Sequence, residues 1–271
     1  MLDAYFERIA YDGPVRTDLE TLRALQRAHL LAIPYENLEI QFGRENLLDE
    51  SAFVDKLVTR RRGGWCYEMN GLLTLALREI GFDVRRVGGA VDRETSGDRQ
   101  NRNHMVGLVD LDRRYVTDVG LGDGPLEPFP LEEREWTEGA ASYSMEDLGD
   151  GWWRFRNDPL ALAPSFDLTE APLTLPDYEP TSTRLQTDPT SSFVGLAIVS
   201  RRTETGYETL RDTTRIVADS GERTETRIDD GDEWAATLRR LLGTDLGPEA
   251  SALWERVRRR SAERAKGRER E

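Results

Sequence analysis

Cys66 is the single cysteine of the sequence, and its setting is typical of a nucleophile. It follows the segment Arg62-Gly63-Gly64-Trp65 and stands where an apolar helical pattern begins. Glycines let a chain turn sharply, and the free N–H groups and positive dipole of a first helical turn favour a thiolate. Lone cysteines are also common core residues, so the residues alone leave a structural role open beside the nucleophilic one.

A nucleophilic cysteine needs a base, and the sequence contains only two histidines. His29 falls within a helical pattern rich in Leu and Ala, where a packed or capping histidine is the better interpretation. His104 follows the polar loop 98–103 and begins a strand-like segment. Catalytic side chains are often found at such junctions on a rigid scaffold, so we expect His104 to be the base.

Asp118 is the expected partner of His104. Residues 104–119 read as strand, turn, strand, and folding about the turn brings Asp118 opposite His104 or its immediate neighbour. Facing Cβ atoms of an antiparallel pair lie about 4.5–5.5 Å apart, so the carboxylate could hold the imidazole Nδ1–H. Asp110 and Asp112 are rival carboxylates, but both fall in the turn itself.

The first eighty-odd residues are predicted to form a small helical bundle that positions Cys66. Thr17, in a capping-box pattern with Glu20, and Ser51 are the expected N-caps of the first two helices, and Gly81 follows the third. The expected helices are 17–33, 51–60 and 66–80.

Beyond residue 82 the pattern changes to short β-rich runs separated by segments rich in Pro and Gly, notably 120–130 and 159–180. This pattern indicates an antiparallel sheet or barrel, followed by helices. The mixed charges of residues 256–271 predict a solvated helix end. The expected strands are 84–91, 104–111, 114–119, 151–156, 193–201, 206–210 and 214–218, and the expected helices are 232–242 and 248–260.

Composition narrows the functional classes. The 271 residues include 51 acidic and 37 basic side chains, and the net charge of -14 argues against nucleic acid as a partner. No run of eighteen apolar residues predicts a membrane span, and residues 1–13 do not read as a signal peptide. A single cysteine fits a reducing, cytoplasmic compartment, whereas the oligomeric state is left open.

The ordered motifs of the sequence resemble the arylamine N-acetyltransferases. The Arg-Gly-Gly-x-Cys element is specific in combination with the downstream His and Asp-Val-Gly-x-Gly elements, although each alone is weak. The matching elements are Ile33-Pro34-Tyr35-Glu36-Asn37-Leu38, Arg62-Gly63-Gly64-Trp65-Cys66, His104, Asp118-Val119-Gly120-Leu121-Gly122 and Leu185-Gln186-Thr187-Asp188-Pro189-Thr190-Ser191-Ser192-Phe193.

The resemblance implies an α+β fold with a cysteine-protease-like Cys-His-Asp core. Residues 1–83 would form a helical bundle carrying the nucleophile, and 84–192 an antiparallel β-barrel carrying His104 and Asp118. Residues 193–271 would form an α/β lid with a charged tail. It also implies ping-pong transfer from acetyl-CoA, without a metal, to small xenobiotic acceptors: arylamines, hydrazines or N-hydroxyarylamines.

The resemblance also assigns contacts with the two substrates. Thr190 and Ser192 would bind CoA through their hydroxyls, although both also read as ordinary turn residues. Tyr35, Leu121 and Phe193 would line the acceptor pocket, although all three also read as plain core.

Behind the site we expect an ion pair between Glu36 and Arg62. Both residues lie close in sequence to predicted site residues, Tyr35 and Cys66, on two loops that must meet if Tyr35 lines the pocket. A bidentate guanidinium–carboxylate contact would fix both loops. The alternative is that Glu36 and Arg62 do not contact each other and are two separate surface charges.

Three other functions use the same residues. An amide synthase or another acyltransferase on this scaffold would share the triad and differ only in its acyl donor. A thiol hydrolase of the transglutaminase or papain type would use the same Cys-His-Asp chemistry. A non-catalytic binding module is disfavoured by the complete triad. The segment Tyr35-Glu36-Asn37 ahead of the Arg-Gly-Gly element favours the transferase.

The acid excess predicts that the fold needs salt. Lys56 and Lys266 are the only lysines among 37 basic residues. A GC-rich coding sequence would explain the missing lysines but not the excess of carboxylates. Because salt screens self-repulsion, we expect the melting temperature to be higher in molar KCl than in dilute buffer. Equal melting temperatures in the two solutions would contradict the prediction that the fold needs salt.

Overall fold

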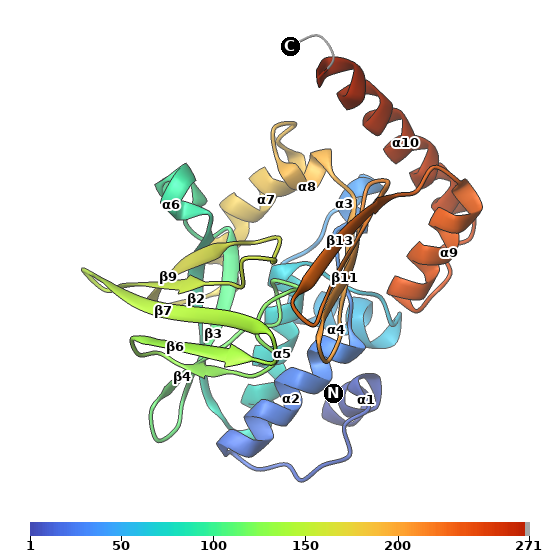
Figure 1. Cartoon of the computed structure of the whole chain (residues 1–271). Coiled ribbons are helices and arrows are strands. Elements are labelled where there is room, and N and C mark those ends of the chain that lie inside the picture. The colour runs from blue at the N-terminus through green and yellow to red at the C-terminus, as the bar shows by residue number, and fades with distance from the viewer. Residues whose placement is uncertain (269–271) are drawn as a thin grey trace.

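The structure is a computed structural model that describes residues 1–268. Two antiparallel sheets dominate it, the larger one at the left of Figure 1 and the smaller one beside the C-terminal helices at the right. Helices α1 (Leu2–Ile9) and α2 (Leu19–Ala32) lie at the bottom of this view. Residues 269–271, the end of the expected charged tail, lie outside the described part.

The N-terminal helices confirm the expected bundle but differ at two caps. Asp18, not Thr17, caps the first long helix, because its carboxylate accepts the N–H of Thr21 at 2.9 Å. Asp49, not Ser51, caps the next helix in the same way. The helices are α1 (Leu2–Ile9), α2 (Leu19–Ala32), α3 (Leu38–Gln41), α4 (Glu50–Val54), the π-helix η1 (Asp55–Thr59) and α5 (Cys66–Ile80).

Helix α5 spans the predicted 66–80 segment and is the central element of the bundle. One face buries Met69, Leu72, Leu73, Ala76 and Leu77 in the N-terminal core. The helix also packs against strands β2 (Asp83–Val91) and β3 (His104–Asp110). Its first residue is therefore held by the helical core and by the larger sheet together.

The larger sheet has the strand order β5-β4-β3-β2-β9-β8-β7-β6. It curls strongly in Figure 1, so the expected barrel takes the form of a curled sheet with β5 and β6 at its two edges. Its other strands are β4 (Arg114–Thr117), β5 (Phe129–Pro130), β6 (Arg134–Glu138), β7 (Ala141–Gly149), β8 (Trp152–Arg156) and β9 (Ser165–Leu173).

Strand β9 corrects the prediction that 159–180 is a loop segment. It pairs with β2 and β8, and Pro172 stands beside an irregularity where the β2 register shifts between Val87 and Gly89. Proline is tolerated at such irregular positions in a sheet. Short helices surround this region: α6 (Arg93–Ser96), η2 (Asp98–Gln100), η3 (Leu175–Tyr178), α7 (Glu179–Thr187) and α8 (Ser192–Gly195).

The smaller sheet has the order β1-β10-β11-β12-β13 and draws its first strand from the N-terminal part of the chain. The expected strand 193–201 was wrong at its start, because Ser191 caps α8 and the strand begins only at Ile198. Helix α9 packs on β10 and β11. The elements are β1 (Tyr35–Glu36), β10 (Ile198–Arg202), β11 (Gly206–Arg211), β12 (Thr214–Asp219), β13 (Glu222–Arg227), α9 (Gly231–Leu242) and α10 (Pro248–Arg268).

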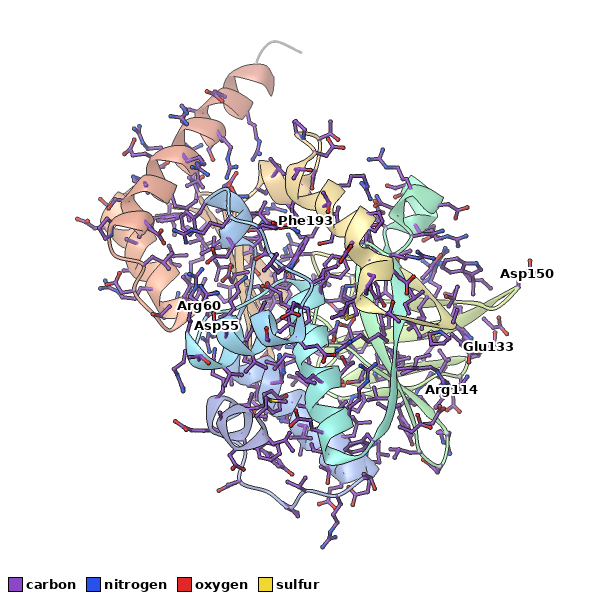
Figure 2. The ribbon with its side chains drawn as sticks, turned by 180° about the vertical axis from the view of Figure 1, so that it is seen from behind. Asp55, Arg60, Arg114, Glu133, Asp150 and Phe193 are labelled. Carbon is purple, nitrogen blue, oxygen red and sulfur yellow. The ribbon has the colours of Figure 1, made fainter. Side chains whose placement is uncertain are left out.

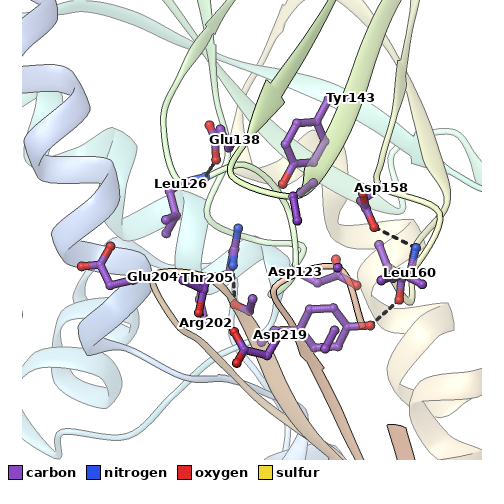
Figure 3. A pocket seen from close by; sticks show the side chains of 17 residues that line it. Asp123, Leu126, Glu138, Tyr143, Asp158, Leu160, Arg202, Glu204, Thr205 and Asp219 are labelled. Atoms are coloured by element: carbon purple, nitrogen blue, oxygen red, sulfur yellow. Dashed lines mark hydrogen bonds between the residues drawn. The ribbon is translucent and has the colours of Figure 1, made fainter. Parts of the chain in front are cut away.

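A buried carboxylate fixes the loop that follows β4 to the loop between β8 and β9. Asp123 accepts hydrogen bonds from the backbone of Leu162 and from the side chain of Asn157. Its burial raises its pKa to about 6. Figure 3 shows Asp123 in a small cavity with Arg202 of β10, which donates to the carbonyl of Gly124 at 3.0 Å.

Arg62 and Glu36 fasten strand β1 to the segment before α5. Arg62 Nη2 lies 3.0 Å from Glu36 Oε1, and Nη1 lies 3.2 Å from Glu39 Oε1. The backbones also pair, since Glu36 N donates to Gly64 O at 2.9 Å. A Cβ on Gly63 would stand 2.2 Å from Pro34 O, so only glycine permits this approach. The contacts place Tyr35 beside the segment that leads to Cys66.

We expect Arg62→Met to lower the free energy of unfolding by roughly 3–5 kcal/mol, because it leaves buried Glu36 without its cation and Glu39 with only the half-exposed Arg44. Glu36→Gln should cost less, since Arg62 keeps Glu39. Urea unfolding of both single variants and the double variant measures the coupling, expected at about 0.5–3 kcal/mol. Single losses that simply add would mean that the pair carries no interaction energy.

The exposed pair Arg60–Asp55 is the matched control. Its atoms lie 2.8 Å apart, but about half of each side chain is exposed; Figure 2 labels both residues. Solvent screens such a pair, so the cycle Arg60→Met, Asp55→Asn should give a coupling of roughly 0–1 kcal/mol.

Candidate active site

Cys66, His104 and Asp118 meet although they come from three separate elements. Cys66 is the first residue of α5, His104 the first of β3, and Asp118 follows the last residue of β4. His104 Nε2 lies 2.7 Å from Asp118 Oδ2, and Cys66 lines the same cavity as His104, close enough to raise the pKa of the imidazole. All three residues are at most 4% exposed.

The geometry corrects two details of the predicted His–Asp contact. Strands β3 and β4 pair Gly107 with Thr117, so Asp118 lies level with Val106 and reaches His104 diagonally. The Asp118 carboxylate binds the Nε2 atom of the imidazole, not the expected Nδ1. Residues two apart on a strand share one face, which is why the diagonal contact is possible. Nδ1 is thereby left for Cys66.

The surroundings of His104 favour its protonated form. Burial lowers its pKa, but the charge and hydrogen bond of Asp118 and the contact with Cys66 outweigh burial. The pKa rises from its ordinary 6.5 to about 10. The imidazole is therefore a strong acceptor for a proton leaving the Cys66 thiol.

Asn70 ties the three elements together and was missed by sequence reasoning. Its Nδ2 donates to Met105 O at 2.6 Å and to Asp118 Oδ1 at 2.7 Å, and its Oδ1 accepts Val119 N at 2.9 Å. The available signal was a polar residue one helical turn after Cys66 within an apolar pattern. Asn70 is 1% exposed, so each of its bonds replaces water in the core.

Two further features fix Asp118, and sequence reasoning missed one of them, Gln26. The Gln26 carbonyl accepts the N–H of Asp118 at 3.2 Å and the hydroxyl of Thr117 at 2.7 Å. Gly120 donates its N–H to Asp118 Oδ1 at 2.7 Å. A Cβ at Gly120 would stand 2.8 Å from Cys66 Cα, so this glycine is required where the loop crosses α5.

The loop ahead of His104 is held by Asn103. Its side chain both accepts the N–H of Val91 at 2.7 Å and donates to Val91 O at 3.0 Å. Its own carbonyl accepts a weak bond from Cys66 Sγ at 3.7 Å. The end of β2 and the start of β3 are therefore fixed at the edge of the site.

A buried ion pair anchors the start of α5. Lys56 Nζ lies 2.7 Å from Glu68 Oε2 and also donates to Asn46 Oδ1 at 3.1 Å. Burial raises the pKa of Glu68, and the Lys56 charge opposes this rise. Glu68 also accepts the N–H of Trp65 at 3.2 Å, which fixes the turn directly before Cys66. The N–H groups of Glu68 and Met69 donate to Trp65 O, so only the very first N–H groups of the helix lack an acceptor within it.

A cavity of about 380 Å³ opens onto Cys66 and His104. The predicted contact residues Tyr35, Leu121, Phe193, Thr190 and Ser192 all line it, whereas Asp118 lies behind His104. Residues of the lining that sequence reasoning did not single out include Val91, Asp92, Arg99, Gln100, Asn103, Leu162, Arg184, Ile198 and Ser200.

Two of the predicted contact residues are constrained by their neighbours. The Phe193 ring, labelled in Figure 2, lies edge-on to Trp65 with 5.3 Å between ring centroids. Its backbone carbonyl accepts the side-chain amides of Asn37 and Gln41. The hydroxyl of Thr190 donates to Asp188 at 2.8 Å, so its binding to a ligand would compete with a local turn.

The second histidine is a structural residue. His29 is completely buried, and its Nδ1 lies 3.0 Å from the hydroxyl of Tyr5. Burial lowers its pKa to about 3, which keeps the ring neutral. Among residues 1–268, no group of three or more His, Cys, Asp or Glu side chains could hold a metal ion. No helix within that range is both long and apolar enough to cross a membrane.

Known proteins match this chain over most of its length. A family model described as N-acetyltransferase matches residues 18–251. The arylamine N-acetyltransferase of Mycolicibacterium smegmatis is 33% identical over 263 residues, covering 91% of this chain and 92% of that protein.

Solved structures of arylamine N-acetyltransferases have the same fold as this chain. The Mycobacterium marinum arylamine N-acetyltransferase in complex with CoA superposes with a TM-score of 0.87 at 28% identity, covering 96% of this chain and 99% of that one. The Nocardia farcinica enzyme gives a TM-score of 0.84 at 33% identity, with 93% of each chain covered. The chain belongs to the arylamine N-acetyltransferase family.

Proposed function

We propose that this protein transfers an acetyl group from acetyl-CoA to an arylamine through an acetyl-Cys66 intermediate. The observation that carries the proposal is the contact of His104 with Cys66 on one side and with Asp118 on the other, at the floor of a cavity. Family membership supplies the acetyl donor and the class of acceptor.

In the first half-reaction, His104 takes the proton of Cys66 Sγ, and the thiolate attacks the thioester carbonyl of acetyl-CoA. Asp118 stabilises the imidazolium that forms. The carbon–sulfur bond to CoA breaks, and the departing thiolate takes the proton from His104. First-turn N–H groups of α5 are the donors closest in sequence to the oxyanion at Cys66.

In the second half-reaction, the amine attacks the acetyl carbonyl of acetyl-Cys66. The imidazole removes a proton from the amine nitrogen and returns it to Cys66 Sγ as the carbon–sulfur bond breaks. We assign Tyr35, Leu121 and Phe193 to the acceptor, because their apolar surface suits a flat aromatic ring. Hydrazines would attack the acetyl group through a nitrogen atom, as arylamines do. N-hydroxyarylamines would attack through nitrogen or through the hydroxyl oxygen.

The remaining assignments complete the proposal. Thr190 and Ser192 face the acetyl donor, and Glu36 with Arg62 supports the wall that carries Tyr35. We also propose that the chain divides into three domains, residues 1–83, 84–192 and 193–271. The proposed location of the protein is the cytoplasm. An amide synthase with another acyl donor remains the alternative, because it would share Cys66 and differ only in the cavity.

Cys66→Ser should abolish acetyl transfer while the protein still folds, because a serine hydroxyl is too weakly acidic to replace the thiolate. Incubation with acetyl-CoA should give an acetyl adduct on wild-type Cys66 by mass spectrometry and none on the variant. Since the chain has one cysteine, the adduct is located without ambiguity. Wild-type turnover in the variant, or intersecting double-reciprocal lines in the wild type, would exclude the covalent mechanism.

Asp118→Asn should lower turnover by roughly 10²–10⁴, because the amide can bind the wrong imidazole tautomer. It should also lower the pKa of His104, since the carboxylate raises that pKa and burial lowers it. NMR of labelled histidine can follow this: the wild-type imidazolium should persist to about pH 10 and the variant's should be lost at lower pH.

Only one other histidine is present, and its pKa of about 3 keeps it out of that range. Asp112→Asn, in the exposed β3–β4 turn, is the matched control and should change neither property. Near-normal turnover with an unshifted His104 titration in Asp118→Asn would reduce Asp118 to a structural carboxylate.

A further inference from the structure

Two arginines at the rim of the catalytic cavity have no carboxylate partner in the described part of the chain. Arg99 of η2 and Arg184 of α7 both line the cavity. Arg184 Nη2 donates to the backbone carbonyl of Arg99 at 3.1 Å, so the two elements meet there. Among residues 1–264, whose side chains the structure describes, no carboxylate oxygen lies within 4.0 Å of either guanidinium.

This is unusual for a chain with 51 acidic and 37 basic side chains. Close to Arg99, Arg93 lies 2.8 Å from Asp98 and 3.0 Å from Asp167. Arg154 also binds Asp167, at 2.7 Å. Carboxylate partners are therefore abundant around the rim, yet none of them is bonded to either of the two cavity arginines in the described part of the chain.

Two other carboxylates near the rim, Asp92 and Asp188, accept hydrogen bonds from hydroxyl groups. Asp92, which also lines the cavity, accepts the hydroxyl of Ser96 at 2.8 Å. Asp188 accepts both the N–H and the hydroxyl of Thr190 at 2.8 Å. Neither acid hydrogen-bonds to Arg99 or Arg184. The bonds from Thr190 lower the pKa of Asp188, and the charges of Arg184 and Arg99 lower it further, so the arginines face this carboxylate without bonding to it. The two guanidinium groups therefore keep donors for an anionic ligand.

We propose that Arg99 and Arg184 bind the phosphate groups of acetyl-CoA. The proposal rests on the proposed function, because it takes the thioester to be at Cys66 on the cavity floor. A cavity of about 380 Å³ is near the lower end of the range for ligand sites, roughly 300–1,000 Å³, so the nucleotide end of the donor extends past the rim.

The charge of the protein makes such a contact necessary. A net charge of -14 repels a donor that itself carries several negative charges, so binding requires local cations where the phosphates emerge. Guanidinium groups present planar donor pairs that match phosphate oxygens. Arg99 and Arg184 supply this from opposite elements, the loop before β3 and the helix before the Thr190–Ser192 segment.

A second cavity, of about 710 Å³, adjoins the first across Thr190–Ser192 and offers a different exit. It is lined by Arg211, Arg227 and Arg264. Two of these are already paired, Arg227 with Asp229 at 2.6 Å and Arg264 with Asp212 at 2.8 Å. Paired guanidinium groups offer less to a phosphate, so the structure favours the Arg99–Arg184 exit.

The test compares two acetyl donors with Arg99→Gln, Arg184→Gln and the double variant. Acetyl-CoA carries the phosphates, whereas S-acetyl-pantetheine is the same thioester without them. We expect kcat/KM for acetylation of Cys66 by acetyl-CoA to fall about tenfold in each single variant and further in the double variant. For S-acetyl-pantetheine the fall should be much smaller, and the KCl dependence with acetyl-CoA should flatten.

Two control variants separate the alternatives. Arg134→Gln, on β6 away from the cavity with its guanidinium over Trp136, should leave both donors unaffected. Arg211→Gln tests the second exit, and a loss specific to acetyl-CoA in this variant alone would overturn the proposal. An equal fall for both donors in the Arg99 and Arg184 variants would also overturn it, because phosphates would not be involved. If neither donor acetylates wild-type Cys66, the proposed function itself fails.

Discussion

The geometry of the site depends on the side chain of Asn70. It lies one helical turn after Cys66, and its amide bonds to Met105 O, Asp118 Oδ1 and Val119 N. The segments carrying the base and its carboxylate partner are therefore both tied to the helix that carries the nucleophile. Because Asn70 and Gly120 occupy one oxygen of Asp118, the other oxygen is directed to His104. An apolar residue at position 70 would leave several buried polar groups without partners.

Buried charges around the site orient its elements more than they stabilise the fold. Lys56 and Glu68 are almost fully buried beside the first turn of α5, and Arg62 shares its charge between Glu36 and Glu39. Desolvation of such pairs offsets much of their attraction, so their net contribution to stability is small. Each pair nevertheless allows one spatial arrangement of its two segments, and those segments carry Cys66 and the cavity wall.

The sequence was most informative where the chemistry is carried by rare residue types. With one cysteine and two histidines, the choice of Cys66 and His104 followed from local context, and the bounds of helix 66–80 followed from its apolar period. Asn70 was missed because its partners lie 35 or more residues away and its own helix gives no sign of them. Strand β13 (Glu222–Arg227) was missed because it is mostly exposed and charged, so its pairing with β12 leaves no apolar alternation.

The acidic composition of the chain favours arginine at the rim of the cavity. Long-range repulsion between an acidic protein and an anionic donor decays over the Debye length, which is about 10 Å at 0.1 M salt and 3 Å at 1 M. Salt that relieves this repulsion equally removes long-range attraction by basic residues. Only groups that touch the phosphates then contribute to binding, and a planar guanidinium keeps its directed hydrogen bonds where a hydrated ammonium keeps mainly its charge. Contact arginines such as Arg99 and Arg184 therefore suit both dilute and concentrated salt, which a diffuse lysine-rich surface would not.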